Sequence, residues 1–305
     1  MTDLVIRALT EDDAHLFTTL HDPTAPLLGH DRFGHPYALR TAGGEYRPDW
    51  SWVALRDGVV VARAAWWAGP DDTRPLSLDR LDFAPGEAAA ATELLRTAPL
   101  SAEYVLLLPP GWREQPAVRA AAEARTAVAR AAGLRPMVER FRYAWTPECG
   151  LPADPGRLVF RPEPDDEVIL EVLRQVERGS LDAHARRAAT EGGIEQAARE
   201  ELEFFHWCPS PREWWRLAYT PGGEPVGLHV PARNHTSPVV GFIGVVPGQR
   251  GHGYAYDLLV DCTRHLASVG ADRIVAETDQ HNTPMAAAFA KAGYPITQER
   301  AYFDR

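Results

Sequence analysis

Cysteine is scarce in this sequence of 305 residues, and its three cysteines, Cys149, Cys208 and Cys262, stand far apart with no Cys-x-x-Cys pair. This spacing argues against a disulfide framework and against a structural zinc site. No stretch approaches the roughly 18 apolar residues of a membrane span, and the first residues lack the charged start and apolar run of a signal peptide. We therefore expect a protein of the reducing cytoplasm with no membrane partner.

Positive charge is also in short supply, with 32 Lys and Arg residues against 42 Asp and Glu residues and a formal net charge of −10. A protein that binds nucleic acid needs a basic surface for the phosphate backbone, so we expect no nucleic-acid partner. An acidic surface favours a neutral or cationic small molecule. The histidines show no His-x-x-x-His or similar ligand spacing, so the sequence predicts no metal site.

The most informative feature that is present is an internal repeat. Leu4–Arg7, followed by an acidic and then an apolar-periodic stretch, has its counterpart in Leu158–Arg161, and both predict a strand that leads into a helix. The closing segments agree best, because Ala132–Arg140 aligns with Ala292–Arg300 at a constant offset. In both closing segments a helix ends at a glycine suited to the left-handed position, and a strand follows. The chain therefore contains two copies of one fold.

Each copy has the same expected order: a strand, one or more helices, two antiparallel strands, a longer strand, a helix, a strand, a helix and a last strand. This order predicts a mixed α/β (α+β) fold with a central mixed sheet flanked by helices. Glu148–Gly156 is rich in glycine and proline and marks the boundary. We expect an N-terminal domain over residues 1–148 and a C-terminal domain over residues 157–305. In the second domain, Glu177–His206 is expected to be helical with a break at Glu191–Gly193.

A strand, a glycine loop and a helix follow one another in the second domain. Pro238–Pro247 is typical of a buried strand, Gly248–Ala255 holds three glycines, and Tyr256–Val269 is expected to be a helix. Glycines let a backbone approach phosphates closely, and the amides at a helix N-terminus attract anions. Arg250 adds a full positive charge. The spacing fits neither the dinucleotide fingerprint nor the P-loop, so those ligands are disfavoured.

At this loop the sequence resembles the GNAT superfamily of N-acetyltransferases. The family signature Arg/Gln-x-x-Gly-x-Gly/Ala is met by Arg250, Gly253 and Ala255. The next strand, Arg273–Thr278, and the helix end Phe289–Tyr294 also stand in the family's order. The resemblance implies two tandem GNAT folds and an acetyl-CoA-dependent N-acetyltransferase, similar in plan to the mycothiol synthase group.

The resemblance also implies an acetyl-CoA site. Backbone groups of Gly244, Val245 and Val246 would pair with the pantetheine arm. The loop that would hold the pyrophosphate consists of Arg250, Gly251, His252, Gly253, Tyr254 and Ala255. Asn282 would reach toward the pantetheine or the thioester, and it also suits the N-cap of the helix that follows.

Acetyl transfer to an amine needs a group that removes the proton of the amine. Glu277, on the strand beside the cofactor strand, is our candidate for this general base, and the alternative is an ordinary acid paired with an arginine. Asp279 and His281 are less favoured, because they are expected in the loop before the next helix, where a solvated surface role is the commoner one. The family often has a tyrosine as the acid for the leaving thiolate where this sequence has Phe289. Three alternatives follow from this difference. Another tyrosine, Tyr254, Tyr294 or Tyr302, could be the acid; the thiolate could leave without an acid; or the protein could bind the cofactor without catalysing transfer.

The first domain lacks the glycine loop. Leu81–Ala90 stands at the corresponding place with one glycine and no arginine, and Glu87 would lie close to the pyrophosphate. We therefore expect this half to keep the fold without binding the cofactor productively.

Several alternatives stay open. The protein could be a non-catalytic acyl-CoA-binding or sensory protein, or an acyltransferase that uses a longer acyl-CoA. The acceptor could be an amino sugar, an aminoglycoside, a polyamine, an amino acid or a peptide N-terminus, and the chain could be a monomer or a homodimer. An aromatic cluster could line a substrate pocket, although its spacing is more typical of core; it consists of His206, Trp207, Trp214 and Trp215.

Overall fold

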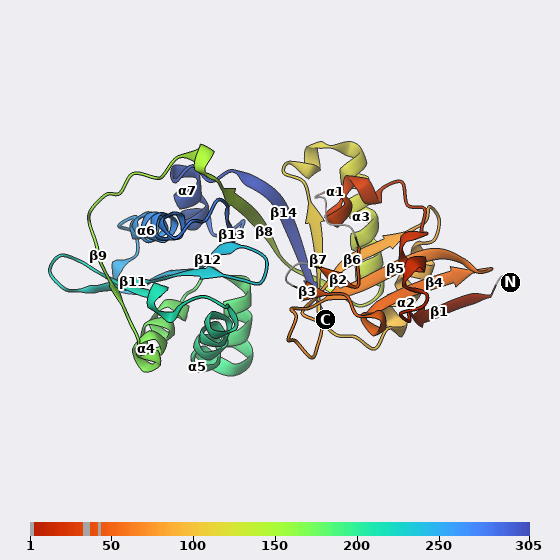
Figure 1. Cartoon of the computed structure of the whole chain (residues 1–305), viewed down its shortest axis with the longest axis horizontal. Coiled ribbons are helices and arrows are strands. Elements are labelled where there is room, and N and C mark those ends of the chain that lie inside the picture. The colour runs from red at the N-terminus through yellow and green to blue at the C-terminus, as the bar shows by residue number, and fades with distance from the viewer. Residues whose placement is uncertain (1–2, 33–36, 42–43) are drawn as a thin grey trace. The chain divides into compact units, whose positions relative to one another are not determined.

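The computed structural model describes residues 3–32, 37–41 and 44–305. The chain forms two compact units, one of residues 1–139 with 298–305 and one of residues 140–297. Each unit has a central sheet with helices (Figure 1), so the expected mixed α/β fold is confirmed. No helix in the described ranges is long and apolar enough to cross a membrane.

The first unit is built on a sheet in the strand order β1-β4-β5-β6-β7-β14. The pairs are antiparallel except for the parallel pair of β6 and β7. Its strands are β1 (Leu4–Ala8), β4 (Ser51–Arg56), β5 (Val59–Trp67), β6 (Ser77–Phe83), β7 (Glu103–Leu108) and the end of β14 (Ile296–Asp304). The shorter elements α1 (Gly29–Arg32), β2 (Arg40–Thr41) and β3 (Gly44–Glu45) lie outside this sheet.

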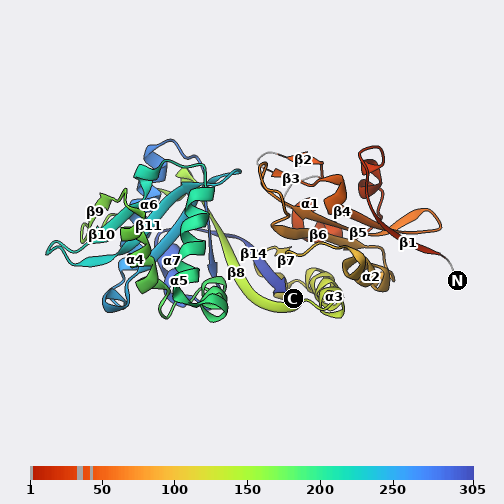
Figure 2. The same cartoon turned by 90° about the horizontal axis from the view of Figure 1, so that it is seen from below.

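Two helices, α2 (Ala88–Thr97) and α3 (Pro116–Ala131), cover one face of that sheet (Figure 2). Their alanine- and leucine-rich faces pack on β5 and β6 in the main core of the unit, where Leu94 is fully buried. The helix expected after Leu4–Arg7 does not form as such. The stretch contains short 3-10 turns at Ala14–Thr18 and Ala25–Leu27, and Pro23, which lies between them, disfavours one continuous helix.

The second unit repeats the same strand order in β9-β10-β11-β12-β13-β8. Its strands are β9 (Val159–Pro162), β10 (Arg216–Tyr219), β11 (Pro225–Arg233), β12 (Pro238–Val245), β13 (Ile274–Asp279) and the end of β8 (Arg135–Trp145). The pair of β12 and β13 is parallel, and the others are antiparallel. The internal repeat of the sequence is therefore a repeat of strand order.

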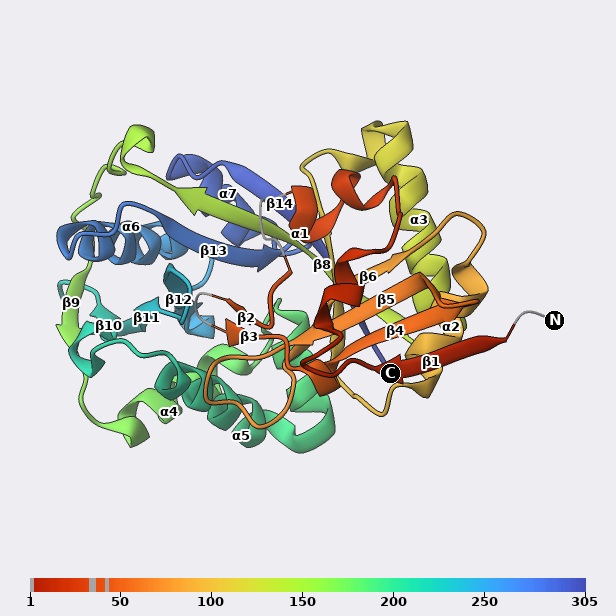
Figure 3. The same ribbon diagram turned by 45° about the vertical axis from the view of Figure 1, so that its right-hand side comes forward.

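Helices α4 (Asp166–Glu177) and α5 (Ala183–Trp207) cover one face of the second sheet, and α6 (Tyr254–Ser268) and α7 (Thr283–Lys291) cover the other (Figures 1 and 3). The apolar side of α4 packs on β11 and β12, and α6 and α7 pack on β13 and β8. The expected break in the long helix is confirmed, because α5 is kinked at Gly193, whose φ is +84°.

The last strand of each repeat belongs to the unit of the other repeat. From Arg140 to Trp145, β8 pairs with β13, and from Glu299 to Phe303, β14 pairs with β7. The predicted ranges 1–148 and 157–305 follow the repeat along the chain, so they differ from the compact units by this exchange of strands.

Candidate functional site

The parallel strands β12 and β13 part from each other soon after they meet. In the described structure their pairing is confined to Val239 and Val275, whereas β12 stays paired with β11 as far as Val245. The backbone of β12 beyond Val239 therefore has polar groups on its β13 side that the sheet does not use. Gly244 and Val245, two of the residues expected at the pantetheine arm, lie on this part of the strand.

The glycine loop leads directly into α6. After a 3-10 turn at Pro247–Gln249, the chain reaches Gly253, which is the N-cap of α6 with φ +75° and ψ +16°. Glycine adopts this left-handed conformation without strain. Gly253 has no side chain to cap the helix, and no other side chain of the described chain does so. The amide of Tyr256 donates to the carbonyl oxygen of Gly253 (3.1 Å), so the amides of Tyr254 and Ala255 are the ones at the helix start that could meet an anion. Anion binding by this loop stays a prediction.

Arg250 is engaged with the protein rather than extended from the loop. Its guanidinium donates to the carbonyl oxygens of Val176 (2.7 Å), Arg178, Gly179 and Val245 (each 3.1 Å). These bonds tie the C-terminal end of α4 to the end of β12, and they satisfy carbonyl groups that a helix end leaves free. The expected contact of Arg250 with a phosphate stays a prediction.

A second arginine, which the sequence analysis missed, lies at the loop. Arg157 donates from Nε to Asp257 (2.9 Å) and from Nη1 to the carbonyl oxygen of His252 (3.0 Å), and it lies over the ring of Tyr254 at 5.0 Å. A Cβ on Gly253 would be 3.8 Å from its Nη2. Arg157 comes just before the expected first strand of the second unit, and no motif surrounds it in the sequence. Its position at the glycine loop is therefore visible only in the structure.

The cofactor strand and α4 approach each other closely. A Cβ on Gly244 would lie 2.6 Å from Cε1 of Phe242 and 2.7 Å from Cγ1 of Val176, so any larger residue here would force these side chains to move. Val176 is followed by Glu177, the last residue of α4. The C-terminal end of α4 is therefore beside the strand expected to hold the pantetheine.

Glu277, the candidate base, lies opposite Arg142 in the pairing of β13 with β8. Its Oε1 accepts a hydrogen bond of 3.3 Å from Nη1 of Arg142, and both side chains are largely buried, at 14% and 19% exposed. The structure thus contains the arginine pair that the sequence analysis gave as the alternative. A catalytic role for Glu277 stays a prediction.

Two further site residues have structural roles. The side chain of Asn282 accepts from the amide of Met285 (3.3 Å) and caps α7, as the sequence suggested. Phe289 is 1% exposed and stacks on Tyr143 with ring centroids 4.2 Å apart. Of the tyrosines considered in its place, Tyr294 is buried with its hydroxyl 2.7 Å from that of Thr263. That hydroxyl is held within the core and is unsuited to serve a ligand.

Asp279, expected to be a solvated loop residue, is instead 1% exposed at the end of β13. Its Oδ1 accepts from Nε of Arg140 (2.8 Å), and its Oδ2 accepts from the amide of Ala183 (2.7 Å). Burial raises the pKa of this carboxyl, and Arg140 opposes that shift. Arg140 also donates to Asp182 (2.5 Å), and it lies 2.8 Å from Nδ1 of His184. His281, the other less favoured candidate, is exposed.

Two glutamates on which the charge of Asp182 acts were not found from the sequence. Burial and the charge of Asp182 raise the pKa of Glu177 to about 7. Burial and the charges of Glu177 and Asp182 raise the pKa of Glu201, on α5, to about 8. Strongly shifted carboxyls occur more often at functional sites than elsewhere. In the sequence each of them is one acid among several on a helix, so no local pattern distinguishes it.

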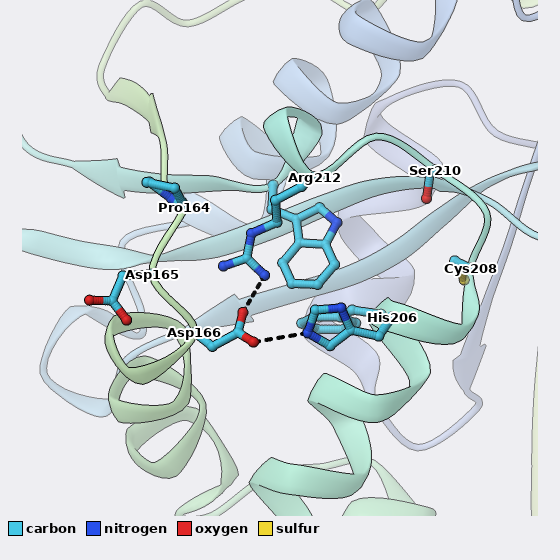
Figure 4. Close-up of a pocket in the computed structure, with 9 residues that line it drawn as sticks. Pro164, Asp165, Asp166, His206, Cys208, Ser210 and Arg212 are labelled. Atoms are coloured by element: carbon cyan, nitrogen blue, oxygen red, sulfur yellow. Dashed lines mark hydrogen bonds and ion pairs between the residues drawn. The ribbon is translucent and has the colours of Figure 1, made fainter.

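A surface pocket of about 620 Å³ lies at the other end of α4 (Figure 4). The carboxylate of Asp166 lies between Arg212 (2.5 Å) and Nε2 of His206 (3.0 Å), while Ser210 lies apart from this group. Two members of the aromatic cluster, His206 and Trp215, line this pocket. Trp215 is 2% exposed and belongs to the core, whereas the side chain of His206 is 52% exposed. The ionic groups of this pocket neutralise one another and do not single out a ligand.

The first unit has a carboxylate where the second has a free helix end. Glu87 is the N-cap residue of α2, as Gly253 is of α6. Arg56 donates to its two oxygens at 3.0 and 2.8 Å, and this hydrogen bonding lowers the pKa of Glu87. An ionised carboxylate fixed at this position would repel a pyrophosphate.

In the described part of the chain no three His, Cys, Asp or Glu side chains are grouped so as to hold a metal ion.

Comparison with known proteins agrees with this geometry. Residues 182–294 match the model of the family described as "Acetyltransferase (GNAT) family". The mycothiol acetyltransferase of Pseudarthrobacter chlorophenolicus is 26% identical over 184 residues, which make up 56% of this chain and 54% of that protein. The match thus extends over about half the length of that curated relative.

Two solved structures have the same fold. A GCN5-related N-acetyltransferase from Sphaerobacter thermophilus has a TM-score of 0.52 at 15% identity, with 98% of this chain and 94% of that chain covered. A glucosamine N-acetyltransferase region of a fungal β-N-acetylglucosaminidase has a TM-score of 0.54 at 13% identity, with 99% of this chain and 38% of that chain covered. At these identities the likeness concerns the fold alone.

Proposed function

We propose that the second unit transfers an acetyl group from acetyl-CoA to a primary amine of a small molecule. The proposal is supported by the match of residues 182–294 to the model of the GNAT family of acetyltransferases. The observation that carries the proposal is a pair of features: the N-terminus of α6 has no side-chain cap, and the parallel strands β12 and β13 separate after Val239 and Val275. Backbone amides at a helix start bind phosphate, and unpaired strand groups can pair with an amide-rich arm such as pantetheine. The low cysteine content supports a reducing, cytoplasmic setting.

In the proposed reaction the neutral nitrogen of the amine attacks the thioester carbonyl carbon, a C–N bond forms, and the C–S bond breaks. The proton of the amine passes to a base, for which Glu277 is our candidate through a water molecule, and the sulfur leaves as the thiolate of CoA. A backbone amide near Val245 would polarise the carbonyl. The protein thus orients the two substrates and removes one proton.

We propose further that only the second unit binds acetyl-CoA. The carboxylate of Glu87, held by Arg56 at the start of α2, occupies the place where the second unit has Gly253. The first unit then serves to complete the architecture of the chain. The ranges 1–148 and 157–305 remain our proposal for the two evolutionary repeats.

A second candidate function is a non-catalytic acyl-CoA-binding protein. It is favoured by Phe289, which cannot donate a proton and is packed against Tyr143. Sustained thiol release that depends on a particular amine would support the enzyme, whereas binding without release would support this alternative. An acyltransferase for longer acyl chains would show itself as a preference for a longer acyl-CoA in the same assay.

The test is a calorimetric titration of the full chain with acetyl-CoA. We expect one site per chain. Gly253→Glu should abolish binding, because it places a carboxylate at the start of α6 and forces a side chain into a left-handed conformation. The matched change in the first unit, Glu87→Ala, should leave stoichiometry and affinity unchanged. Two sites per chain, or equal loss in both variants, would overturn the assignment to the second unit.

A further inference from the structure

Four carboxylates on α4, α5 and β13 are coupled electrostatically through Asp182, whose charge acts on each of the other three. They are Glu177, the last residue of α4; Asp182, the N-cap of α5; Glu201, farther along α5; and Asp279, the last residue of β13. We call them the carboxylate cluster. Glu177 and Asp279 are buried at 4% and 1% exposed, whereas the side chain of Asp182 is 40% exposed. The cluster therefore extends from the surface to a buried floor.

Positive charge in the protein does not balance the cluster. Arg140 is shared between Asp279 and Asp182 and also contacts His184. Arg250 acts on Glu177 from a distance, but its N–H groups are donated to carbonyl oxygens. Two of the four carboxylates are thus left without a paired cation in the described part of the chain.

The buried carboxylate of Glu177 has an unused acceptor. Its Oε2 has no hydrogen-bond partner among the described residues, although it is inaccessible to solvent. The groups that face Glu177 are Ser180, Asp182, Glu201 and Arg250, and those that face Glu201 are Glu177, Asp182, Arg140 and Cys208. A buried oxygen without a partner is costly unless something else donates to it.

The cluster lies next to the expected cofactor strand. Val176, the neighbour of Glu177, packs on Gly244 of β12, and its carbonyl oxygen accepts from Arg250 of the glycine loop. The C-terminal end of α4, where Glu177 stands, is therefore next to the strand that is expected to hold the pantetheine.

We propose that the carboxylate cluster binds a cationic group of the acceptor, and that the acceptor is a diamine or polyamine with one ammonium held at Glu177 and Glu201 while another amine reacts. This inference rests on the proposed function. The reacting nitrogen must be neutral, and a cluster of carboxylates holds an ammonium in its charged form. The cluster therefore suits the ammonium that does not react. Binding of this cation ionises carboxyls that are protonated near neutral pH, so it releases protons.

The experiment compares 1,4-diaminobutane with n-butylamine, which has the same carbon chain and one ammonium fewer. The full chain is titrated by calorimetry at pH 7.5, with saturating CoA in place of acetyl-CoA so that no transfer occurs. We expect the diamine to bind about tenfold or more tightly than the monoamine, as for a charge-assisted hydrogen bond. Titrations in buffers with different ionisation enthalpies should show proton release for the diamine.

Glu177→Gln and Glu201→Gln should each reduce the preference for the diamine by about tenfold and reduce the proton release. Glu203→Gln is the matched control, since Glu203 is an exposed residue on the same helix. We expect the variants to fold, because glutamine has the shape of glutamate and adds no charge. Thermal unfolding measures whether they do. Equal affinity for the two amines, no binding of either amine, or an unchanged preference in both cluster variants would overturn the inference. Loss of CoA binding in the wild-type chain would instead count against the proposed function.

Discussion

At the scale of single residues, the ion pair of Glu277 with Arg142 sets a precise test of the candidate base. Glu277→Gln keeps the size of the side chain and its position opposite Arg142, but it removes the proton acceptor. We expect turnover to fall by about a hundredfold, as for loss of a general base, with the affinity for acetyl-CoA unchanged. Because the change weakens a largely buried ion pair, unfolding free energy should fall by about 1–2 kcal/mol.

The measurements for this prediction are steady-state rates across pH, calorimetry with acetyl-CoA and urea unfolding. Glu213→Gln, at an exposed position of the same unit, is the control. If Glu277→Gln lowers stability but keeps the wild-type pH–rate profile, Glu277 serves as a structural partner of Arg142 and not as the base.

Residues of the glycine loop could be predicted from the sequence because their chemistry is local. Gly253 at the start of a helix and Asn282 at an N-cap depend on neighbours a few residues away. Arg157, Glu177 and Glu201 could not be found in this way, because they acquire their surroundings from segments far along the chain. Arg157, for example, is bound to Asp257, 100 residues away.

At the scale of elements, the packing of α4 against α5 predicts how stability depends on pH. The pKa values of Glu177, about 7, and Glu201, about 8, lie above the ordinary glutamate value of 4.5 in the unfolded chain. Between pH 5 and pH 8 the folded state thus holds more protons than the unfolded state. Unfolding free energy should therefore decrease as pH rises through this range, by up to about 1.4 kcal/mol per pH unit for each group.

Urea unfolding at pH 5.5 and pH 8 tests this dependence. Glu201→Gln should flatten it, because glutamine is neutral at both values, whereas the exposed Glu203→Gln should leave it as in the wild type. The lowered pKa of His229 adds a change of opposite sign below pH 6.5, but this change is common to all variants and cancels in the comparison. An equal slope in Glu201→Gln and the wild type would mean that the two helices do not hold a protonated carboxyl.

The order of elements could be predicted from the sequence where turn residues and apolar periods are strong. The helices of the second unit and the kink at Gly193 are examples. After β1 the expected helix is replaced by two short 3-10 turns, with Pro23 between them where it disfavours a continuous helix. The exchange of the last strands between the two units could not be predicted, because the sequence pattern of β8 and of β14 is the same whichever sheet the strand joins.

At the scale of the whole molecule, the exchange of strands predicts which fragments fold. A fragment of residues 157–305 follows the sequence repeat but lacks the end of β8, which pairs with β13. It also lacks Tyr143 and Trp145, each 2% exposed in the core under α6 and α7. A fragment of residues 140–297 keeps this strand and omits the part of β14 that pairs with β7.

We expect the fragment 140–297 to unfold cooperatively and to bind one acetyl-CoA, and the fragment 157–305 to aggregate or to lack a cooperative transition. Loss of a large buried aromatic side chain costs about 3–5 kcal/mol, and two such losses are comparable to the whole stability of an ordinary domain. Circular dichroism on heating, sedimentation and calorimetry with acetyl-CoA measure these properties for both fragments. If 157–305 were as stable as 140–297 and bound acetyl-CoA equally well, the end of β8 would be dispensable and the unit of folding would be the repeat along the chain.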